Sequence, residues 1–432
     1  MILRDPVHGL IAFDLPEESV IVRLLGTTEM QRLRRIKQLG VASLVFPGGE
    51  HTRFAHAIGT AHVMKRLIAR LRDVDEHLAP HQRLVPERAT EALAAALLHD
   101  VGHGPLSHLF EEALAGAPPH EEWSTRIILD PASEVSQILS QQDPGLPARV
   151  AELVLGRHEL TYLARAVSGT VDVDRCDYLL RDAHGTGVPH GRYDLDWLLR
   201  SFRFGPVAEG GAHRGGAAPP LAIDGGKGIV ALEAFVLARL FMFQQVYFHK
   251  AARAAEWMIG RVLSRVAHLL RDGSPVSDVP RALLSMAQGT KVSLFDYLEL
   301  DDHLIHCAMH SWELAGDPIL ADLTSRVRRR ALFKTLELYE KNAEQWQTAL
   351  EIARDIARRR GLLPECYVGL DVASDTPFRD EDDPLAVVFP HGVIRKPGDV
   401  SFLLGRLRGE TVTRARLIFA PELRDEIRSA VT

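Results

Sequence analysis

EALAAALLHDVGHGP, at residues 91–105, is the segment that indicates the architecture most clearly. Its first eight positions are apolar almost all round, which is typical of a helix buried on every side rather than of a surface helix. Gly102, Gly104 and Pro105 then end the helix. His99 and Asp100 therefore lie where a buried helix opens into a loop, a place from which polar side chains can reach a ligand.

The segments around this helix predict a mainly α-helical protein. From Thr27 to about Arg360 most segments have helical rather than alternating periodicity. We therefore expect a helical domain at residues 1–360 and a small mixed α+β lobe at residues 361–432, where short apolar runs are separated by proline and glycine. A stretch rich in Gly, Ala and Pro at about 204–228 predicts an exposed hairpin or a flexible loop within the main domain.

Three helices can be predicted together with their ends. Thr28 and Gln31 have the spacing of a capping box, and Gly40 supplies a stop for the helix that they begin. A long helical stretch is expected from about Ile229 to Arg271, and another from about Ala331 to Arg360.

Composition narrows the class of protein. The chain has 432 residues, 46% of them hydrophobic and 25% charged, which is ordinary for a soluble globular protein larger than one core usually serves. A net charge of -6 argues against non-specific nucleic-acid binding as the main task. The three cysteines lack CxxC spacing and fit a reducing, cytoplasmic location. No signal peptide is expected, and Glu233 and Arg239 interrupt the apolar residues 229–243, which favours a buried helix over a membrane span.

Four residues far apart in the chain could hold one divalent metal ion: His56, His99, Asp100 and Asp174. Such an ion is bound by neutral imidazoles and carboxylates. Neighbouring residues on a helix point about 100° apart, so His99 and Asp100 can share an ion only near a helix end. His56 taken alone would more often be a structural histidine. The donor types accept iron, manganese, zinc, nickel or magnesium, and additional magnesium could accompany substrate phosphates.

An ordered set of motifs connects these residues to a known family. The motifs are DPVHG at Asp5–Gly9, QRLRRIKQLG at Gln31–Gly40, FPGGEHTRFAHAIG at Phe46–Gly59, LLHDVGHGPLSH at Leu97–His108, DVDRCDYLLRD at Asp172–Asp182 and YFHK at Tyr247–Lys250. In this order they resemble the HD superfamily, and within it the deoxynucleoside triphosphate triphosphohydrolases. The resemblance implies that the four candidate residues are metal ligands. It also implies that water attacks the α-phosphorus of a dNTP, which releases a deoxynucleoside and inorganic triphosphate.

The resemblance further implies the catalytic residues. The departing 5′-oxygen needs a proton, and His108 with Glu111 matches the family's histidine–acid pair. Their spacing lets the carboxylate orient the imidazole on one helix turn. Without the flanking motif, the two would be interpreted as a polar pair on the surface. His103 and His120 match positions that contact phosphate or orient the attacking water.

The substrate contacts follow from the same resemblance. They are Arg53, Arg175, Tyr178, Arg239 and Lys250 for the triphosphate, and Gln38, Leu39, Asp182 and Tyr247 for the sugar. Asp182 would accept a hydrogen bond from the 3′-hydroxyl, while Leu39 and Tyr247 would crowd the 2′ position and exclude ribonucleotides. Two ordinary explanations stay open: Leu39 as a core residue, and Asp182 as the partner of Arg181 or Arg192.

The match departs from some relatives near the base and at the effector site. Phe243 and Phe248 stand where those relatives have a histidine and a glutamine, which favours broad use of dNTPs if the rings stack on the base, although both could be core residues. Gly26 lacks the carboxylate with which an activated relative reads guanine, so no GTP effector is assigned. A homo-oligomer, dimer or tetramer, with a nucleotide effector between subunits is implied by the resemblance alone.

Two other functions remain open at this stage. Another HD phosphohydrolase would act on a monophosphate, a cyclic dinucleotide or a guanosine alarmone, although the GYP companion motif of the cyclic-dinucleotide enzymes is missing. A nucleotide-sensing or nucleic-acid-binding protein would keep the site as a vestige. The basic stretches Arg32–Arg35 and Arg328–Arg330 leave nucleic-acid contact open, but exposed helix faces explain them as well.

Overall fold

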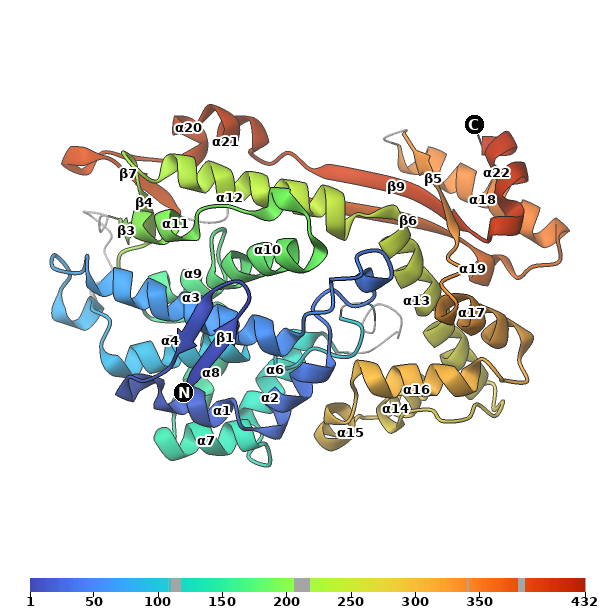
Figure 1. The fold of residues 1–432 in the computed structure, drawn as a ribbon, viewed down its shortest axis with the longest axis horizontal. Helices are drawn as coiled ribbons and strands as arrows, with labels where there is room; N and C mark the ends of the chain where they lie inside the picture. The colour runs from blue at the N-terminus through green and yellow to red at the C-terminus, as the bar shows by residue number, and fades with distance from the viewer. Residues whose placement is uncertain (108, 110–117, 206–217, 340–341, 380–384, 432) are drawn as a thin grey trace.

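The computed structural model describes residues 1–107, 109, 118–205, 218–339, 342–379 and 385–431. It shows a mainly helical chain with three small sheets, which confirms the predicted fold class. The helices of residues 19–98 and 120–186 gather in one body around the N-terminus, and those of residues 250–328 pack at the other end of the molecule (Figure 1). Strands β6 and β9 run along one edge toward the C-terminus (Figure 1).

The helices fall into two groups along the chain. Those of the first group are α1 (Ser19–Leu24), α2 (Thr28–Arg32), α3 (Arg53–Arg72), α4 (Pro86–Leu98), α6 (His120–Leu129), α7 (Glu134–Gln142), α8 (Leu146–Val154), α9 (Thr161–Val167) and α10 (Val173–Thr186). Those that follow α10 in the chain are α11 (Leu195–Ser201), α12 (Ile229–Met242), α13 (Lys250–Arg271), α14 (Arg281–Ala287), α15 (Leu294–Leu298), α16 (Asp302–Trp312), α17 (Pro318–Arg328), α18 (Ala343–Arg359), α19 (Pro364–Tyr367), α20 (Pro397–Val400), α21 (Phe402–Leu407) and α22 (Arg424–Val431).

The strands form three sheets that join distant parts of the chain. Their members are the hairpin β1 (Ile2–Asp5) and β2 (Gly9–Ala12), the sheet β3 (Phe202–Phe204), β4 (Leu221–Asp224), β7 (Ala386–Val388) and β8 (Ile394–Arg395), and the sheet β5 (Lys334–Leu338), β9 (Val412–Phe419) and β6 (Val368–Asp375). β3 pairs antiparallel with β4, as in a hairpin, and residues 206–217 between them lie outside the described residues. Because β4 pairs with β7 and β5 with β9, strands from both sides of residue 360 share sheets. The domain boundary at 360/361 stays a prediction.

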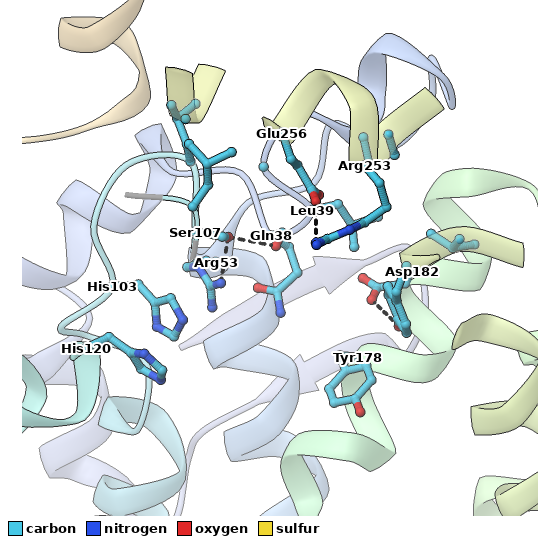
Figure 2. Close-up of a pocket in the computed structure, with 18 of the residues that line it drawn as sticks. Gln38, Leu39, Arg53, His103, Ser107, His120, Tyr178, Asp182, Arg253 and Glu256 are labelled. Atoms are coloured by element: carbon cyan, nitrogen blue, oxygen red, sulfur yellow. Dashed lines mark hydrogen bonds and ion pairs between the residues drawn. The ribbon is translucent and has the colours of Figure 1, made fainter. Parts of the chain in front are cut away.

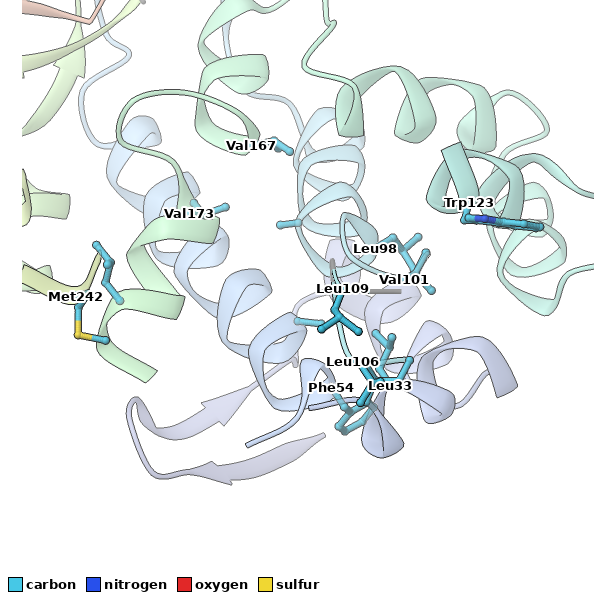
Figure 3. Packing of buried hydrophobic residues seen from close by; sticks show 14 of the residues in the cluster. Leu33, Phe54, Leu98, Val101, Leu106, Leu109, Trp123, Val167, Val173 and Met242 are labelled. Carbon is cyan, nitrogen blue, oxygen red and sulfur yellow. The ribbon is translucent and has the colours of Figure 1, made fainter. Parts of the chain in front are cut away.

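Helix α4 lies in the centre of the first half, as its sequence predicts. Every residue from Ala89 to Leu98 is buried. Helix α3 packs against α4 on one side and against α10 on another. Figure 3 shows Leu33, Phe54 and Leu106, from three separate segments, in the same cluster just below the end of α4. This packing fixes the point at which His99 and Asp100 leave the helix.

Three expectations about helices need correction. The prediction of one helix from Ala331 to Arg360 is wrong at its start, because KTLEL pairs with β9 as strand β5 and α18 begins only at Ala343. Short apolar runs fit either state, and here the backbone pairing decides. The stretch Ile229–Arg271 is broken: α12 passes into a π-helical turn at Phe243–Tyr247, and α13 starts afresh at Lys250. The early helix is capped by Thr27 rather than Thr28.

Within the part of the chain that the structure describes, one helix is long and apolar enough to cross a membrane, judged by length and composition alone. It spans Ile229–Tyr247, with a mean hydropathy of 1.6. In the structure its α12 part packs against α10, α11 and α21. Core helices of soluble proteins reach the same hydropathy, so this value alone is weak evidence for a membrane span.

A buried ion cluster on α4 gives the fold a pH-dependent component. The Glu91 side chain is 1% exposed and accepts hydrogen bonds from Arg88 (2.9 Å), Arg149 (2.5 Å) and His158 (3.1 Å). Burial raises the pKa of Glu91, but these three partners outweigh it and lower the pKa from 4.5 to about 2. The stabilisation is therefore complete above pH 4.5 and is lost as the pH falls toward 2.

We expect Glu91→Gln to lower the free energy of unfolding at pH 7 by about 3 kcal/mol, because it leaves the partner cations without their shared carboxylate. Urea unfolding at pH 7, 5 and 3 measures this, and the difference from the unmodified protein should shrink at pH 3. Glu87→Gln, an exposed position on the same helix, is the matched control. A difference that does not change with pH would contradict the assignment.

Candidate active site

The structure brings the four predicted metal ligands together. His56 lies on α3, His99 and Asp100 follow α4, and Asp174 lies in the first turn of α10. The Nε2 atom of His56 is 3.3 Å from Nε2 of His99 and 3.0 Å from Oδ1 of Asp174. The Nε2 atom of His99 is 3.5 Å from Oδ1 of Asp100 and 3.4 Å from Oδ1 of Asp174. Two imidazole nitrogens and two carboxylates thus face one point.

Hydrogen bonds behind the ligands fix which ring nitrogen faces that point. Nδ1 of His99 donates to the carbonyl oxygen of Ala96 at 2.9 Å, so its Nε2 keeps the lone pair. Nδ1 of His56 lies 2.8 Å from Oδ2 of Asp177. A carboxylate or carbonyl behind a histidine is the usual way in which proteins orient an imidazole toward a metal.

The charges around this point favour a bound cation. Burial favours neutral His56, but hydrogen bonds to Asp174 and Asp177 outweigh it and raise the pKa of His56 to about 10. Burial likewise opposes ionisation of Asp100, yet neighbouring histidines and Arg53 hold its pKa well below the usual range. A divalent ion can replace the proton that this cluster otherwise attracts. The donor set therefore fits a divalent metal, and nitrogen with carboxylate ligands leaves its identity open.

A buried network of hydrogen bonds and ion pairs, which the sequence interpretation missed, lies behind the His56 ring. Asp177 is fully buried and also contacts His8 (2.6 Å) and Arg181 (2.8 and 2.9 Å), and Arg181 in turn binds Asp5 (2.8 Å). The DPVHG motif makes this possible, because Asp5 accepts hydrogen bonds from the backbone N–H groups of residues 7 and 8 in the turn between β1 and β2. The motif was the available signal, but nothing in the sequence showed what His8 would touch.

The predicted catalytic residues fall into two groups. His103 and His120 lie beside the metal site: their ring centroids are 3.7 Å apart, and Nδ1 of His103 is 3.3 Å from Oδ1 of Asp100. His108 and Glu111 lie outside the described residues. Their role as an acid pair stays a prediction.

A pocket of about 670 Å³ extends from the metal site. Predicted substrate residues on its wall are Gln38, Leu39, Arg53, Tyr178, Asp182 and Tyr247 (Figure 2). Asp182 accepts a hydrogen bond from the Tyr247 hydroxyl at 2.7 Å and contacts Nε2 of His51 at 2.7 Å. Arg181 instead pairs with Asp177 and Asp5, so Asp182 is not its partner. Arg53 bridges Asp100 and the Ser107 hydroxyl at the metal end.

The other predicted phosphate contacts are not among the residues that line this pocket. Arg175 is paired with Asp172 at the start of α10. Arg239 donates to Asp375 at 2.7 Å and to the carbonyl oxygen of Pro377 at 3.2 Å. Lys250 is exposed at the first residue of α13. The structure does not bring these three cations to the pocket wall, and their substrate roles stay predictions.

Helix α13 and strand β6 supply wall residues that the sequence did not single out. They are Arg253, Glu256, Trp257, Arg261 and Asp371. Arg253 binds Asp371 and Glu256, and Figure 2 shows the pair with Glu256 above Leu39. Phe243 reaches the pocket, whereas Phe248 is 6% exposed and is not among its lining residues. The wall residues of α13 are spread along the helix and form no sequence motif, so the sequence held no signal by which to find them.

Known proteins resemble this chain in sequence and in fold. A family model described as the HD domain matches residues 53–182, the segment that carries all four proposed ligands. The crystal structure of a phosphohydrolase from Bacteroides thetaiotaomicron superposes with a TM-score of 0.79 at 27% identity, covering 97% of this chain and 100% of that one. The uncharacterized protein YwfO of Bacillus subtilis is 32% identical over 98% of this chain and 92% of its own length. The chain belongs to the HD-domain phosphohydrolases.

More distant relatives of this HD phosphohydrolase have a named substrate. The deoxynucleoside triphosphate triphosphohydrolase SAMHD1 homolog of Dictyostelium discoideum is 26% identical over 88% of this chain and 69% of its own length. The combination of HD fold and His/Asp cluster makes the protein a metal-dependent phosphohydrolase.

Proposed function

We propose that this phosphohydrolase converts deoxynucleoside triphosphates into deoxynucleosides and inorganic triphosphate. The observation that carries the proposal is a single pocket lined both by Asp100 and Asp174 of the metal site and by the hydrogen-bonded Asp182–Tyr247 pair. A volume of about 670 Å³ is in the range of nucleotide-sized sites. The names of the more distant relatives support the same substrate class.

The residues around the metal site can bind the innermost phosphate of the substrate. A divalent ion bound by His56, His99, Asp100 and Asp174 supplies charge neutralisation for phosphoryl oxygens and increases the acidity of water. Arg53 lies against Asp100 and offers a guanidinium to a phosphate oxygen. His103 and His120 line the same pocket. Their proposed task is to hold a phosphate oxygen or to orient the water that attacks the α-phosphorus.

The departing 5′-oxygen needs a proton. The proposed donor of this proton is His108, with Glu111 orienting its imidazole. The sugar end then needs an acceptor and a steric limit. Asp182, Leu39 and Tyr247 all line the pocket. The proposal is that Asp182 accepts a hydrogen bond from the 3′-hydroxyl and that Leu39 with the ring of Tyr247 excludes a 2′-hydroxyl.

The test is incubation of the purified protein with each dNTP and rNTP, with manganese or magnesium, followed by identification of both products. Inorganic triphosphate with a deoxynucleoside, and little turnover of rNTPs, is the expected result. Phosphate or pyrophosphate as the product would indicate another phosphohydrolase. Binding without turnover would indicate a nucleotide sensor with a vestigial site.

The His108→Ala variant should keep its metal and lose roughly 100-fold or more of its rate, because it lacks the general acid and not a ligand. The loss should be much smaller with an aryl phosphate ester, whose leaving group needs no proton. Metal analysis and rates on both substrates measure this. Equal losses on the two substrates would show that the acid has been misassigned.

A homo-oligomer with a nucleotide effector between subunits is a further part of the proposal. Size-exclusion chromatography with and without dNTP should show an earlier elution with nucleotide. An elution volume that stays fixed would remove the effector from the proposal.

A further inference from the structure

Three arginines and a tryptophan share one face of α13. Arg253, Trp257, Arg261 and Arg265 follow at intervals of four residues, so their side chains lie above one another. Two of the arginines have carboxylate partners: Arg253 binds Asp371 at 2.7 Å and Arg265 binds Asp317 at 2.5 Å.

Arg261 differs from its two neighbours on this face. Its guanidinium carbon lies 5.4 Å from the centroid of the Trp257 ring. Among the described residues no carboxylate pairs with Arg261, and its buried Nε has no hydrogen-bond acceptor. Burial lowers the pKa of Arg261, whereas the hydrogen bond to Asp317 raises the pKa of Arg265.

A half-buried guanidinium without a counter-charge is costly, and a bound ion or water is one of the ways in which native proteins satisfy such a group. Arginine cannot relieve the cost by losing its proton, because its pKa stays far above neutrality. An anion beside Arg261 would supply the missing counter-charge.

A second cavity of about 430 Å³ lies at this arginine. Arg261 and Trp257 line both this side cavity and the substrate pocket. Arg354 of α18 reaches the side cavity too; its Nη1 binds Glu351 at 2.9 Å, while its buried Nε has no acceptor among the described residues. Glu365, which is exposed, is the single carboxylate among the described residues that line the side cavity.

The wall between the two cavities is fixed in place. A Cβ atom on Gly369 of β6 would come within 2.3 Å of the Trp257 indole, so the indole lies directly against the β6 backbone. Only glycine leaves room for this contact. The cavity is thus part of the packing of α13 against β6 and not a gap between mobile side chains.

We propose that the side cavity binds a phosphate-class anion between Arg261 and Arg354. Two guanidinium groups supply directional donors that match phosphate oxygens, and both have an Nε without an acceptor. The volume admits inorganic phosphate, inorganic triphosphate or the phosphate of a nucleotide with its base near Trp257. The site is independent of which substrate the metal centre hydrolyses.

The test compares Arg261→Met and Arg354→Met with the unmodified protein by calorimetric titration and thermal unfolding. Both variants should bind inorganic phosphate at least tenfold more weakly and lose the rise in Tm that phosphate gives. Without phosphate, Arg261→Met should be at least as stable as the unmodified protein, because a buried unpaired charge has been removed. Arg358→Met, on an exposed position of the same α18, should behave like the unmodified protein.

Parallel titrations with inorganic phosphate, inorganic triphosphate and 5′-dAMP identify the source of the anion. Tightest binding of triphosphate, dependent on Arg261, would point to free polyphosphate, and tightest binding of 5′-dAMP would point to a nucleotide. Phosphate affinities of both methionine variants equal to that of the unmodified protein would overturn the proposal. Crystals grown in phosphate give a second readout that needs no variant: an anion beside Arg261 Nε is expected, and its absence at saturating phosphate would equally overturn it.

Discussion

His99→Ala should stop turnover and leave the metal site empty while the helical fold persists. The imidazole is one of the four proposed ligands, and its Nε2 lies within 3.5 Å of carboxylate oxygens of both Asp100 and Asp174. Without it these two carboxylates and His56 remain, and they hold a divalent ion too weakly for catalysis. Losing the ion removes several kcal/mol of stabilisation from the transition state, so the rate should fall roughly 1,000-fold or more.

The fold should survive because His99 lies at the open end of α4 and its side chain is 13% exposed. The packing of α4 ends at Leu98, which the substitution does not touch. Elemental analysis, a turnover assay and circular dichroism on the same preparation separate the three effects. His184→Ala removes an exposed histidine from α10 and should change none of them. A His99→Ala protein that keeps its full metal content would remove His99 from the ligand set.

The sequence could predict the positions of His99 and Asp100 because these two residues sit in a recognisable local setting. Helix α4 is apolar until His99, and the glycines and proline after Asp100 end it, so the position of these two residues follows from local rules. His56 and Asp174 carry no such local signal. They were found only through the order of the motifs that surround them.

The rest of the site depends on contacts between segments distant in the chain. DVDRCDYLLRD contains four aspartates, and composition does not say which faces the metal. In α10, Asp174, Tyr178 and Asp182 recur every four residues and line the pocket, whereas Asp177 turns toward α3. That division depends on the rotation of α10 against α3, where a Cβ on Gly59 would come 1.9 Å from Asp177 Oδ1. Local periodicity contains no such information.

The same limit explains the strand that replaced part of a predicted helix. KTLEL at residues 334–338 has no strong preference, and its pairing with β9 involves residues about eighty positions later. The wall residues of α13 were missed for a similar reason. Arg253, Trp257 and Arg261 look like one polar and amphipathic helix face until β6 is placed against it.

Asp177→Asn should weaken metal binding by roughly 10- to 100-fold without removing any ligand, which is the effect expected for a residue that orients one. The amide keeps the size of the carboxylate but can no longer accept from His56, His8 and Arg181 as an anion. His56 then loses the partner that fixes its ring, and its Nε2 should bind the ion less well. Turnover should fall at limiting metal and recover largely with excess metal, which His99→Ala should not do.

Stability gives the second readout for Asp177→Asn. Arg181 is 2% exposed and would keep only Asp5 as a counter-charge, so the free energy of unfolding should drop by about 3 kcal/mol. Asp355→Asn breaks an exposed pair with Arg358 on α18 and should cost less than about 1 kcal/mol. Metal titration and urea unfolding of both variants measure the two effects. If Asp177→Asn bound metal as tightly as the unmodified protein, the buried network would serve the packing of α10 on α3 and not the orientation of His56.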